Sequence, residues 1–403
     1  MFDVVVVGAG LAGLAAAVEL ERAGLRVRAY EAGDEVGGRV RTDAADGFLL
    51  DRGFQLLNPS YPAVRALVDV AELRPQPFQR LVRVVDGDRV RLLGNPFDSP
   101  KALRGLLPPG PVSTRDLLAL AAMSLRDLLP ARLITGAADQ HAAQELQRWG
   151  LSAQIVEKVL RPFLSGVFGE ADLDTSSRFL HLAWRSFVRA APVLPAAGMA
   201  ALPRLLADRL APDALVLDAA VDAVRPGAVD VGGRTEQSPA VVVATDGSTA
   251  ARLLPGLREP HWNGLRTFYY RTSTAPLTRP VLTVASDGPV VNTAVMSAAA
   301  PTYAPAGHAL IAATTLGGDD DRAMEPAVRF ALAKLYRTST AGWDLVADYR
   351  IPKPCPGCPR RTRCAARSGW SAACTCAATT ATPARSRGRS FPVGALLARS
   401  SLI

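Results

Sequence analysis

The sequence predicts an α/β fold in which two separated stretches of chain share one parallel sheet, with a largely helical α+β domain inserted between them. Three observations predict it. A buried strand, a glycine-rich turn and an Ala-rich helix open the chain, a second α/β stretch begins near residue 198, and the segment between them is helical and punctuated by prolines. At 403 residues the chain is also too long for a single hydrophobic core.

The first 31 residues predict a βαβ unit. A β-branched run at 3–7 is typical of a buried parallel strand, residues 11–23 have helical spacing, and 25–30 is a second strand. The turn between the first strand and the helix contains Gly8, Gly10, Leu11, Ala12 and Gly13.

This turn has the spacing of a Rossmann-like dinucleotide site. Gly8 permits the tight turn, Gly10 lets the backbone approach a pyrophosphate, and Gly13 lets the helix pack closely on the strand. The helix N-terminus offers free N–H groups to the phosphates. Glu31 follows 18 residues after Gly13 and can accept both ribose hydroxyls, which disfavours a 2′-phosphate and therefore NADP.

Further elements follow from local patterns. We expect strands at 48–51, 81–85, 214–217, 221–224, 239–245, 281–284 and 310–315, and helices at 113–129, 137–149, 151–160, 199–210 and 327–336. Pro162 should end the helix that begins at residue 151. From Pro352 onward periodicity vanishes.

These elements predict a discontinuous organisation. Residues 1–85 and 195–255 should form the nucleotide-binding domain, and residues 86–194 and 256–351 the substrate domain. Residues 352–403 form an aberrant basic tail that we expect to be disordered.

The net charge of +9 does not indicate nucleic-acid binding. Nine basic residues and no acidic ones lie between Pro352 and Ile403, so the remaining 37 basic residues balance the 37 acidic ones. All five cysteines lie in the last 49 residues; Cys355 and Cys358 have zinc-ligand spacing, but no His follows, and we expect no metal site. No segment has the pattern of a signal peptide or membrane span, so we expect a cytoplasmic protein, with peripheral membrane contact left open.

A second glycine phrase favours FAD over NAD. Gly37, Gly38 and Arg39 come just after the ribose-binding acid, where Arg39 can bridge pyrophosphate oxygens and the glycines let the loop pass close to the cofactor. A simple NAD dehydrogenase has no reason to wrap its cofactor again at this point.

Together these motifs resemble those of the flavin amine oxidase, phytoene desaturase and protoporphyrinogen oxidase superfamily. The resemblance continues through Leu50-Asp51-Arg52-Gly53 and, more weakly, through 161–168, 195–199 and 221–224, and covers about residues 1–350. It implies FAD as cofactor, Asp51 and Gly53 near the flavin ring, and backbone contact between Val221 and the adenine. It also implies transfer of a hydride to the flavin from a C–H next to nitrogen or from a saturated C–C unit of a small, hydrophobic substrate.

The C-terminus departs from this family. Its members close with a Gly- and Asp-rich flavin-binding phrase and a helix, which this chain lacks. A frameshift near Pro352 accounts for the charge, the cysteines and the lost periodicity together. Read from the third codon base, with suitable synonymous codons, 372–399 can spell GLYVCGDHRDTGSIQGALVSGRRAARA, which resembles the missing phrase.

The sequence leaves several alternatives open. The chain is either an active FAD enzyme or an inactive, weakly flavin-binding remnant, with an NAD-binding reductase as a third possibility. No catalytic residue can be named, because the four histidines are scattered among unlike neighbours, and Asp319–Asp321 is typical of a solvated turn. The sequence contains no information on the oligomeric state.

Overall fold

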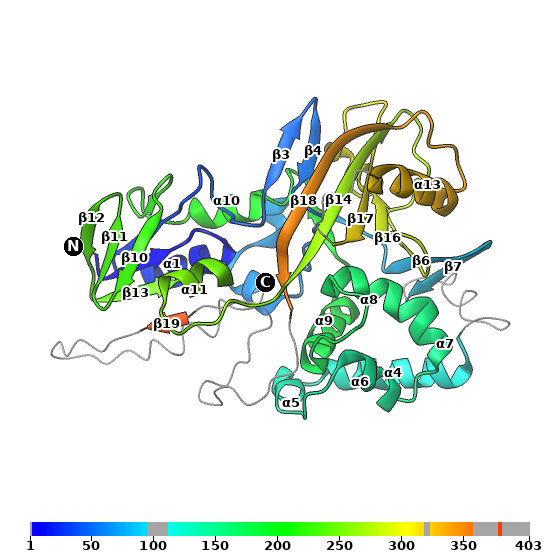
Figure 1. Ribbon diagram of the computed structural model, residues 1–403, viewed down its shortest axis with the longest axis horizontal. Helices are drawn as coiled ribbons and strands as arrows, with labels where there is room; N and C mark the ends of the chain where they lie inside the picture. Colours follow the sequence, from blue (N-terminus) through cyan, green and yellow to red (C-terminus); the bar gives the residue numbers. More distant parts are fainter. Residues whose placement is uncertain (1, 95–111, 318–322, 358–377, 381–403) are drawn as a thin grey trace.

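The computed structural model describes residues 2–94, 112–317, 323–357 and 378–380. One end of the molecule is a five-stranded sheet with strand order β19-β13-β1-β2-β9 (Figure 1). Four of its strands are parallel and come from two distant stretches of chain, β1 (Val4–Val7) and β2 (Val27–Tyr30) from one, β9 (Leu215–Val216) and β13 (Ala240–Val243) from the other. The edge strand β19 (Ala378–Thr380) runs antiparallel to β13. The α/β class is therefore confirmed.

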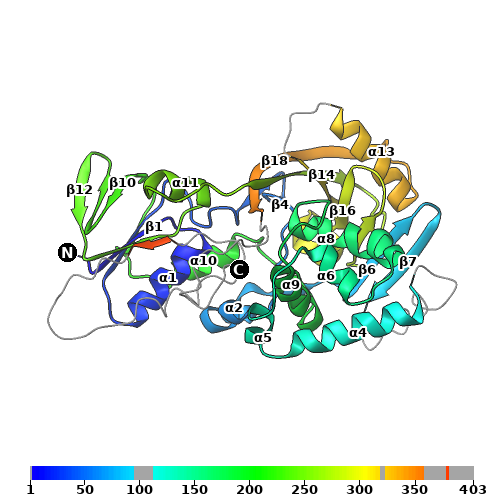
Figure 2. The ribbon, with the colours of Figure 1, turned by 60° about the horizontal axis from the view of Figure 1, so that its bottom comes forward.

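Both faces of this sheet are covered, which explains the unbroken valine run of β1. Val4 and Val6 pack against α1 (Leu11–Arg22) and α10 (Ala201–Ala207), which lie side by side in Figure 2. Val5 and Val7 pack on the opposite face against α11 (Gly247–Leu253) and a three-stranded meander. The meander consists of β10 (Val221–Arg225), β11 (Ala228–Val231) and β12 (Arg234–Gln237). A strand buried on both faces has no polar alternation.

The second large element is a seven-stranded mixed sheet with the order β18-β14-β17-β16-β15-β6-β7. Its strands are β6 (Leu81–Asp86), β7 (Arg89–Gly94), β14 (Trp262–Thr272), β15 (Leu282–Ala285), β16 (Val290–Val295), β17 (Ala309–Leu316) and β18 (Asp344–Pro356). All neighbours are antiparallel except β15 and β6. One face packs on α13 (Met324–Tyr336).

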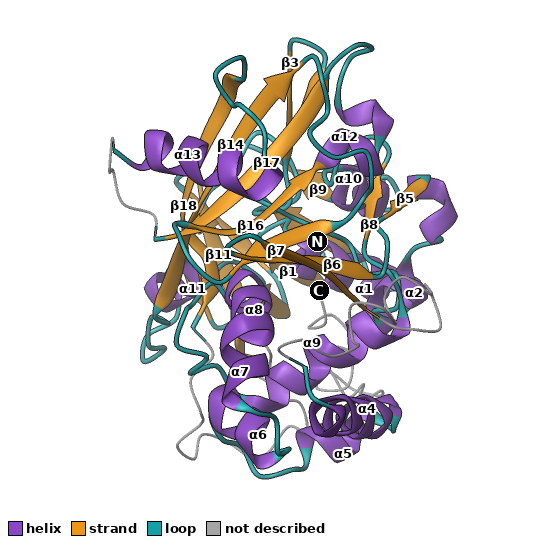
Figure 3. Ribbon diagram, turned by 90° about the vertical axis from the view of Figure 1, so that its right-hand side faces the viewer, coloured by secondary structure: helices purple, strands orange, loops and turns teal. Residues whose placement is uncertain are grey.

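A layer of helices lies beneath the two sheets in Figure 3. It consists of α4 (Thr114–Leu128), α5 (Ala131–Thr135), α6 (Ala142–Arg148), α7 (Ala153–Ile155), a π-helical turn (Val156–Leu160), α8 (Arg161–Phe168) and α9 (Ser177–Arg189). Their buried faces share one hydrophobic core with Val84 of β6 and Val284 of β15, so the helices are packed on the large sheet.

Short elements connect these layers. They are β3 (Thr42–Ala45), β4 (Phe48–Asp51), α2 (Pro62–Leu67), a 3₁₀ turn (Val70–Leu73), β5 (Pro75–Pro77), β8 (Val193–Pro195), β10 (Val221–Arg225), β11 (Ala228–Val231), β12 (Arg234–Gln237), α12 (Met296–Ala299) and a second 3₁₀ turn (Pro301–Tyr303). β3 and β4 form a hairpin, and β5 pairs with β8.

The expected place of residues 81–85 is wrong. The sequence assigns this strand to the nucleotide-binding domain, but β6 pairs with β15 in the seven-stranded sheet. The second domain also contains more strand than the sequence indicated, because β14 and β18 pair along their whole lengths. Such long-range pairing leaves little local pattern.

The expected helix end at Pro162 is also wrong. The chain passes from α7 through the π-helical turn directly into α8, with Pro162 in the first turn of α8. Proline is tolerated there because the preceding turn is π-helical, and this wider turn accommodates both the ring and the missing N–H donor.

The sequence predicts that regular structure ends at Pro352, but it extends further along the chain. β18 continues through Pro356, pairing Pro356 with Trp262 and Cys355 with Asn263. β18 is the edge strand, where a proline removes no hydrogen bond that a further strand would need. Most of the expected disordered tail, with Cys358 and the later cysteines, lies outside the described residues, as does Asp319–Asp321.

The described residues contain neither a membrane span nor a metal centre. None of their helices is long and apolar enough to cross a membrane. No group of three or more His, Cys, Asp or Glu side chains in this part of the chain is arranged to hold a metal ion.

Candidate functional site

One cavity of about 2070 Å³ runs from the carboxyl edge of the five-stranded sheet to the helical layer. Ten of the twelve predicted site residues line it: Gly8, Gly10, Leu11, Ala12, Glu31, Gly37, Gly38, Arg39, Gly53 and Val221. Gly13 and Asp51 do not. The volume exceeds the roughly 300–1,000 Å³ of a pocket for one small ligand, so the cavity has room for a dinucleotide and a second molecule.

The glycine turn has the geometry of a phosphate cradle. Gly8 has φ +98°, a conformation that favours glycine, and a Cβ on Gly13 would lie 1.8 Å from the Gly8 carbonyl oxygen. Gly10 is the N-cap of α1 and offers no side-chain cap, and the first turn of α1 contains no acid. The N–H groups of that turn are therefore free to bind an anion.

Glu31 is fixed at the end of β2 by backbone donors. Its Oε2 accepts from the Ala9 N–H at 2.7 Å and its Oε1 accepts from the Gly33 N–H at 2.9 Å. Each carboxylate oxygen keeps a second lone pair, so the side chain can still accept hydroxyl groups from a ribose.

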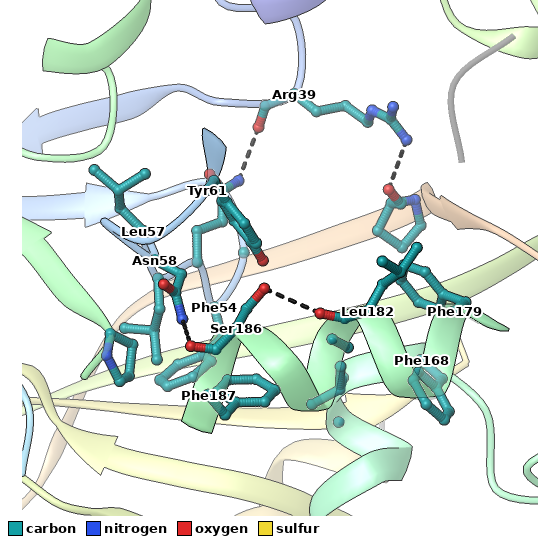
Figure 4. Close-up of a pocket in the computed structure, with 18 of the residues that line it drawn as sticks. Arg39, Phe54, Leu57, Asn58, Tyr61, Phe168, Phe179, Leu182, Ser186 and Phe187 are labelled. Atoms are coloured by element: carbon teal, nitrogen blue, oxygen red, sulfur yellow. Dashed lines mark hydrogen bonds between the residues drawn. The ribbon is translucent and has the colours of Figure 1, made fainter. Parts of the chain in front are cut away.

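The second glycine loop lies against the first. The Gly37 N–H donates to the Ala9 carbonyl at 2.9 Å, and Gly37 has φ +112°. Beyond it, Arg39 Nη1 donates to the Pro354 carbonyl of β18 at 2.6 Å (Figure 4). The guanidinium also lies 5.7 Å from the Trp262 ring. Arg39 thus bridges the nucleotide end of the cavity and the edge of the large sheet, with further N–H donors for a ligand.

Asp51 is a buried anchor. Its carboxylate is fully buried and accepts from Thr42 Oγ1 at 2.5 Å, the Met199 N–H at 2.9 Å and the Tyr303 hydroxyl at 2.9 Å. Burial raises the pKa of Asp51 to about 6, although these three hydrogen bonds act in the opposite direction. The side chain holds three segments together behind Gly53, which lines the cavity.

The sequence did not indicate several lining residues. Thr245 and Asp246 follow β13 at the same edge of the sheet as Glu31, and Tyr349–Lys353 reach the cavity from β18. Ligands of open α/β sheets bind at this carboxyl edge, so the end of the expected strand at 239–245 was the available signal. The β18 residues had no such signal, because they arrive through long-range pairing.

The helical end of the cavity is lined mainly by apolar side chains. Phe168, Phe179 and Leu182 come from α8 and α9, with Phe54 and Phe187 close by in Figure 4. Asn58 Nδ2 donates to the Ser186 carbonyl at 2.9 Å, which ties the loop before α2 to α9. The arrangement forms an apolar chamber at this end of the cavity.

The acids of the cavity lie at one end. Among the described lining residues only Glu31 and Asp246 are acidic, and both follow strands of the five-stranded sheet. The basic lining residues are Arg39, Arg52, Arg80, Arg185, Arg189, Arg252, Arg350 and Lys353. The described part of the apolar chamber therefore offers no carboxylate to pair with a cationic substrate.

The histidines lie outside this cavity. His181 is buried in the helical layer, with Nδ1 at 2.8 Å from Asp127 Oδ2 and Nε2 at 3.1 Å from Glu145 Oε1. His141 contacts the Asp174 carbonyl, and His308 packs edge-on against Phe48. None of the four lines the cavity as the described residues define it.

The residues present fit FAD on geometric grounds. A tight glycine turn, an uncapped helix N-terminus and a carboxylate converge at the carboxyl edge of a parallel sheet, and Arg39 extends the polar lining toward the chamber. These features define the class, a dinucleotide-binding protein whose cofactor site opens into an apolar chamber.

The family is more specific. The family model for flavin containing amine oxidoreductases matches residues 11–343, and the chain belongs to this family. The model describes flavin-containing oxidoreductases, so the resemblance found in the sequence is confirmed at the level of the family.

Curated relatives share parts of the sequence. Protoporphyrinogen oxidase 2 of Arabidopsis thaliana is 28% identical over 179 residues, which cover 43% of this chain and 34% of that enzyme. Putrescine oxidase of Kocuria rosea is 49% identical over 78 residues, 19% of this chain and 16% of that enzyme. The matches thus span about a third or less of these relatives' own lengths.

Solved structures share the fold. An oxidoreductase from Methanosarcina mazei superposes with a TM-score of 0.69 at 15% identity, covering 88% of each chain. Putrescine oxidase bound to putrescine superposes with a TM-score of 0.62 at 19% identity, covering 87% of this chain and 84% of that one.

Proposed function

We propose that this protein removes a hydride from a C–C or C–N unit of a small, hydrophobic substrate that is neutral or anionic. The observation that supports this most is the single cavity in which an FAD cradle opens into an apolar chamber with no acidic lining residue among those described. When bound, FAD would accept the hydride. The chain's own residues supply binding, orientation and exclusion of water.

We infer these roles for the residues. The glycine turn, Glu31 and Gly37 would hold the adenosine and pyrophosphate half, with Val221 beside the adenine and Arg39 on the pyrophosphate. Gly53, kept in place by Asp51, would lie near the flavin ring. A Cβ there would lie 2.6 Å from Ile351 Cδ1, so the close approach of this loop to β18 depends on a glycine. The aromatic side chains of the chamber would exclude water, and the hydride step itself needs no acid or base. The proton that the substrate loses when the double bond forms would pass to solvent.

The substrates that occur in the names of the relatives differ in charge, so the charges that line the chamber favour some of them over others. Putrescine carries two ammonium groups at neutral pH, and burying them without a carboxylate is unfavourable. Porphyrinogens and hydroxysqualene, the substrates in the names of other relatives, carry carboxylates or no charge. The chamber favours these classes over a diamine.

The test is an anaerobic mixing experiment on the FAD-loaded protein. Protoporphyrinogen, coproporphyrinogen III and putrescine are added separately, and the visible absorbance of the flavin is followed. We expect loss of absorbance with a porphyrinogen and none with putrescine. Reduction by putrescine alone would contradict the proposal.

We also propose that the protein contacts anionic lipid surfaces at the mouth of this cavity. Leu118 and Leu125 of α4 are 68% and 67% exposed and line the cavity, as does the exposed Leu128. The two acids of 112–135, Asp116 and Asp127, are both buried, so the charges that this surface exposes are arginines. Exposed leucines flanked by arginines fit an anionic bilayer, from which a hydrophobic substrate could enter.

A further inference from the structure

We propose that Asn292 binds a hydroxyl group of the substrate, so that the chamber takes a hydrophobic molecule carrying an uncharged hydroxyl rather than a pure hydrocarbon. The inference rests on the proposed function, because it assigns a role within the same chamber. Its physical basis is separate, since it depends on one amide and its neighbours and not on FAD.

Asn292 is a buried polar side chain without a partner among the described residues. It lies in β16, is 5% exposed and lines the cavity. Its Oδ1 is buried and accepts no hydrogen bond, and its amide nitrogen donates none to any described residue. Buried polar groups are almost always paired, so an unpaired amide in a ligand cavity indicates a ligand group.

The neighbouring helix leaves space for this amide. A Cβ on Gly166 of α8 would lie 2.3 Å from Asn292 Nδ2, so any larger residue at 166 would displace the amide. Gly166 also lines the cavity. The close approach of α8 to β16 therefore depends on a glycine opposite this unpaired amide.

The sheet does not satisfy the amide either. Asn292 lies opposite Thr314 of β17, and Thr314 lies opposite Thr267 of β14, so the three side chains share one face. The two threonine hydroxyls lie 3.5 Å apart and pair with each other. Asn292 lies at the end of this polar row, and its amide is available to hydrogen-bond a molecule in the cavity.

The chemistry of the amide selects a hydroxyl. The group offers one acceptor and a pair of donors, and a hydroxyl can both donate and accept. An ammonium would also need a carboxylate, which the described part of the chamber lacks. A hydrocarbon would displace water from the amide and leave it unpaired, so it should bind more weakly than an alcohol of the same shape.

The test compares naphthol with methylnaphthalene, in which a methyl group replaces the hydroxyl. Binding of each probe is measured by equilibrium dialysis to the wild-type chain, Asn292→Leu and Thr283→Val. Thr283 is a matched control, because its hydroxyl is likewise buried and unpaired on neighbouring β15 but does not line the cavity. The FAD content of every sample is measured in parallel.

We expect wild type and Thr283→Val to prefer naphthol by about tenfold, and Asn292→Leu to lose that preference. Gly166→Ala should lose it too, and serves as the second variant where Asn292→Leu does not fold. Equal binding of the two probes to wild type, no binding of naphthol, or a preference that persists in both variants would overturn the inference. If the samples contain no FAD but wild type still prefers naphthol, the result would count against the proposed function alone.

Discussion

The Ala9 N–H donates to Glu31 Oε2 at 2.7 Å, so the glycine turn after β1 and the acid after β2 form one unit. Ala9 is fully buried, and its N–H has this carboxylate as its partner. Glu31 therefore orders the glycine turn, and we propose that it also binds the ribose.

Replacing Glu31 separates these two roles. Glu31→Ala should weaken FAD binding by about 1–3 kcal/mol, because charge-assisted partners are left unpaired. It should also lower the melting temperature without FAD, since the Ala9 N–H is orphaned. Glu31→Gln keeps one acceptor for Ala9 and should restore most of the melting temperature but less of the affinity. Calorimetric titration with FAD checks this, and unchanged affinity in both variants would remove Glu31 from the site.

Arg39 should bind the cofactor through two N–H groups of its planar guanidinium, and not through its positive charge alone. Arg39→Ala should weaken FAD binding by about 1–3 kcal/mol, and Arg39→Lys should recover only part of this, because an ammonium cannot bridge two phosphate oxygens in the same plane. Arg22, exposed on the far end of α1, supplies a control as Arg22→Ala. A full recovery by lysine would contradict a bidentate contact.

The buried Asp51 predicts a pH-dependent stability. Its pKa rises to about 6 on folding from an ordinary value of 3.8, so the folded protein holds this proton over a range where the unfolded chain has lost it. The stabilisation is present below pH 4 and is lost as the pH rises to 6. Relative to Asp51→Asn, the wild-type free energy of unfolding should therefore fall by about 3 kcal/mol between pH 4 and pH 7. Urea unfolding of both proteins measures it; a difference that does not vary with pH would refute this assignment.

The leucine surface at the cavity mouth predicts binding to anionic vesicles. Leu118→Asp combined with Leu125→Asp should reduce sedimentation with phosphatidylserine-containing vesicles at least tenfold, because two apolar contacts become charges that lipid repels. Phe330→Asp is the matched control, since Phe330 is 64% exposed on α13 and does not line the cavity. Equal loss in the control, or binding that is insensitive to the leucines, would show that this surface does not contact lipid.

Local parts of the fold could be predicted from the sequence. The βαβ unit, its glycine turn and Glu31 follow from spacing within about 30 residues, and the structure has them where expected. The large sheet could not be predicted in the same way. β14 ends at Thr272 and β18 begins only at Asp344, so the two strands specify each other through long-range pairing, while three prolines obscure the end of β18.

The site was predictable to the same extent. Residues in a sequence motif were identified, but their roles depend on packing, which the motif does not contain. Asp51 resembled a cofactor contact and is instead a buried anchor between Thr42, Met199 and Tyr303. Asn292 belongs to no sequence motif, because whether an amide lacks a hydrogen-bond partner depends on the residues that pack around it.

FAD binding by the purified 403-residue chain tests the central claim most directly. Thermal melting is recorded with added FAD and with added NADP, beside a chain whose C-terminus is restored to the shifted frame. We expect FAD to raise the melting temperature of both chains, more in the restored one, and NADP to have no effect, because only a ligand of the folded state stabilises it. A rise with NADP, or no rise with FAD in either chain, would contradict the account.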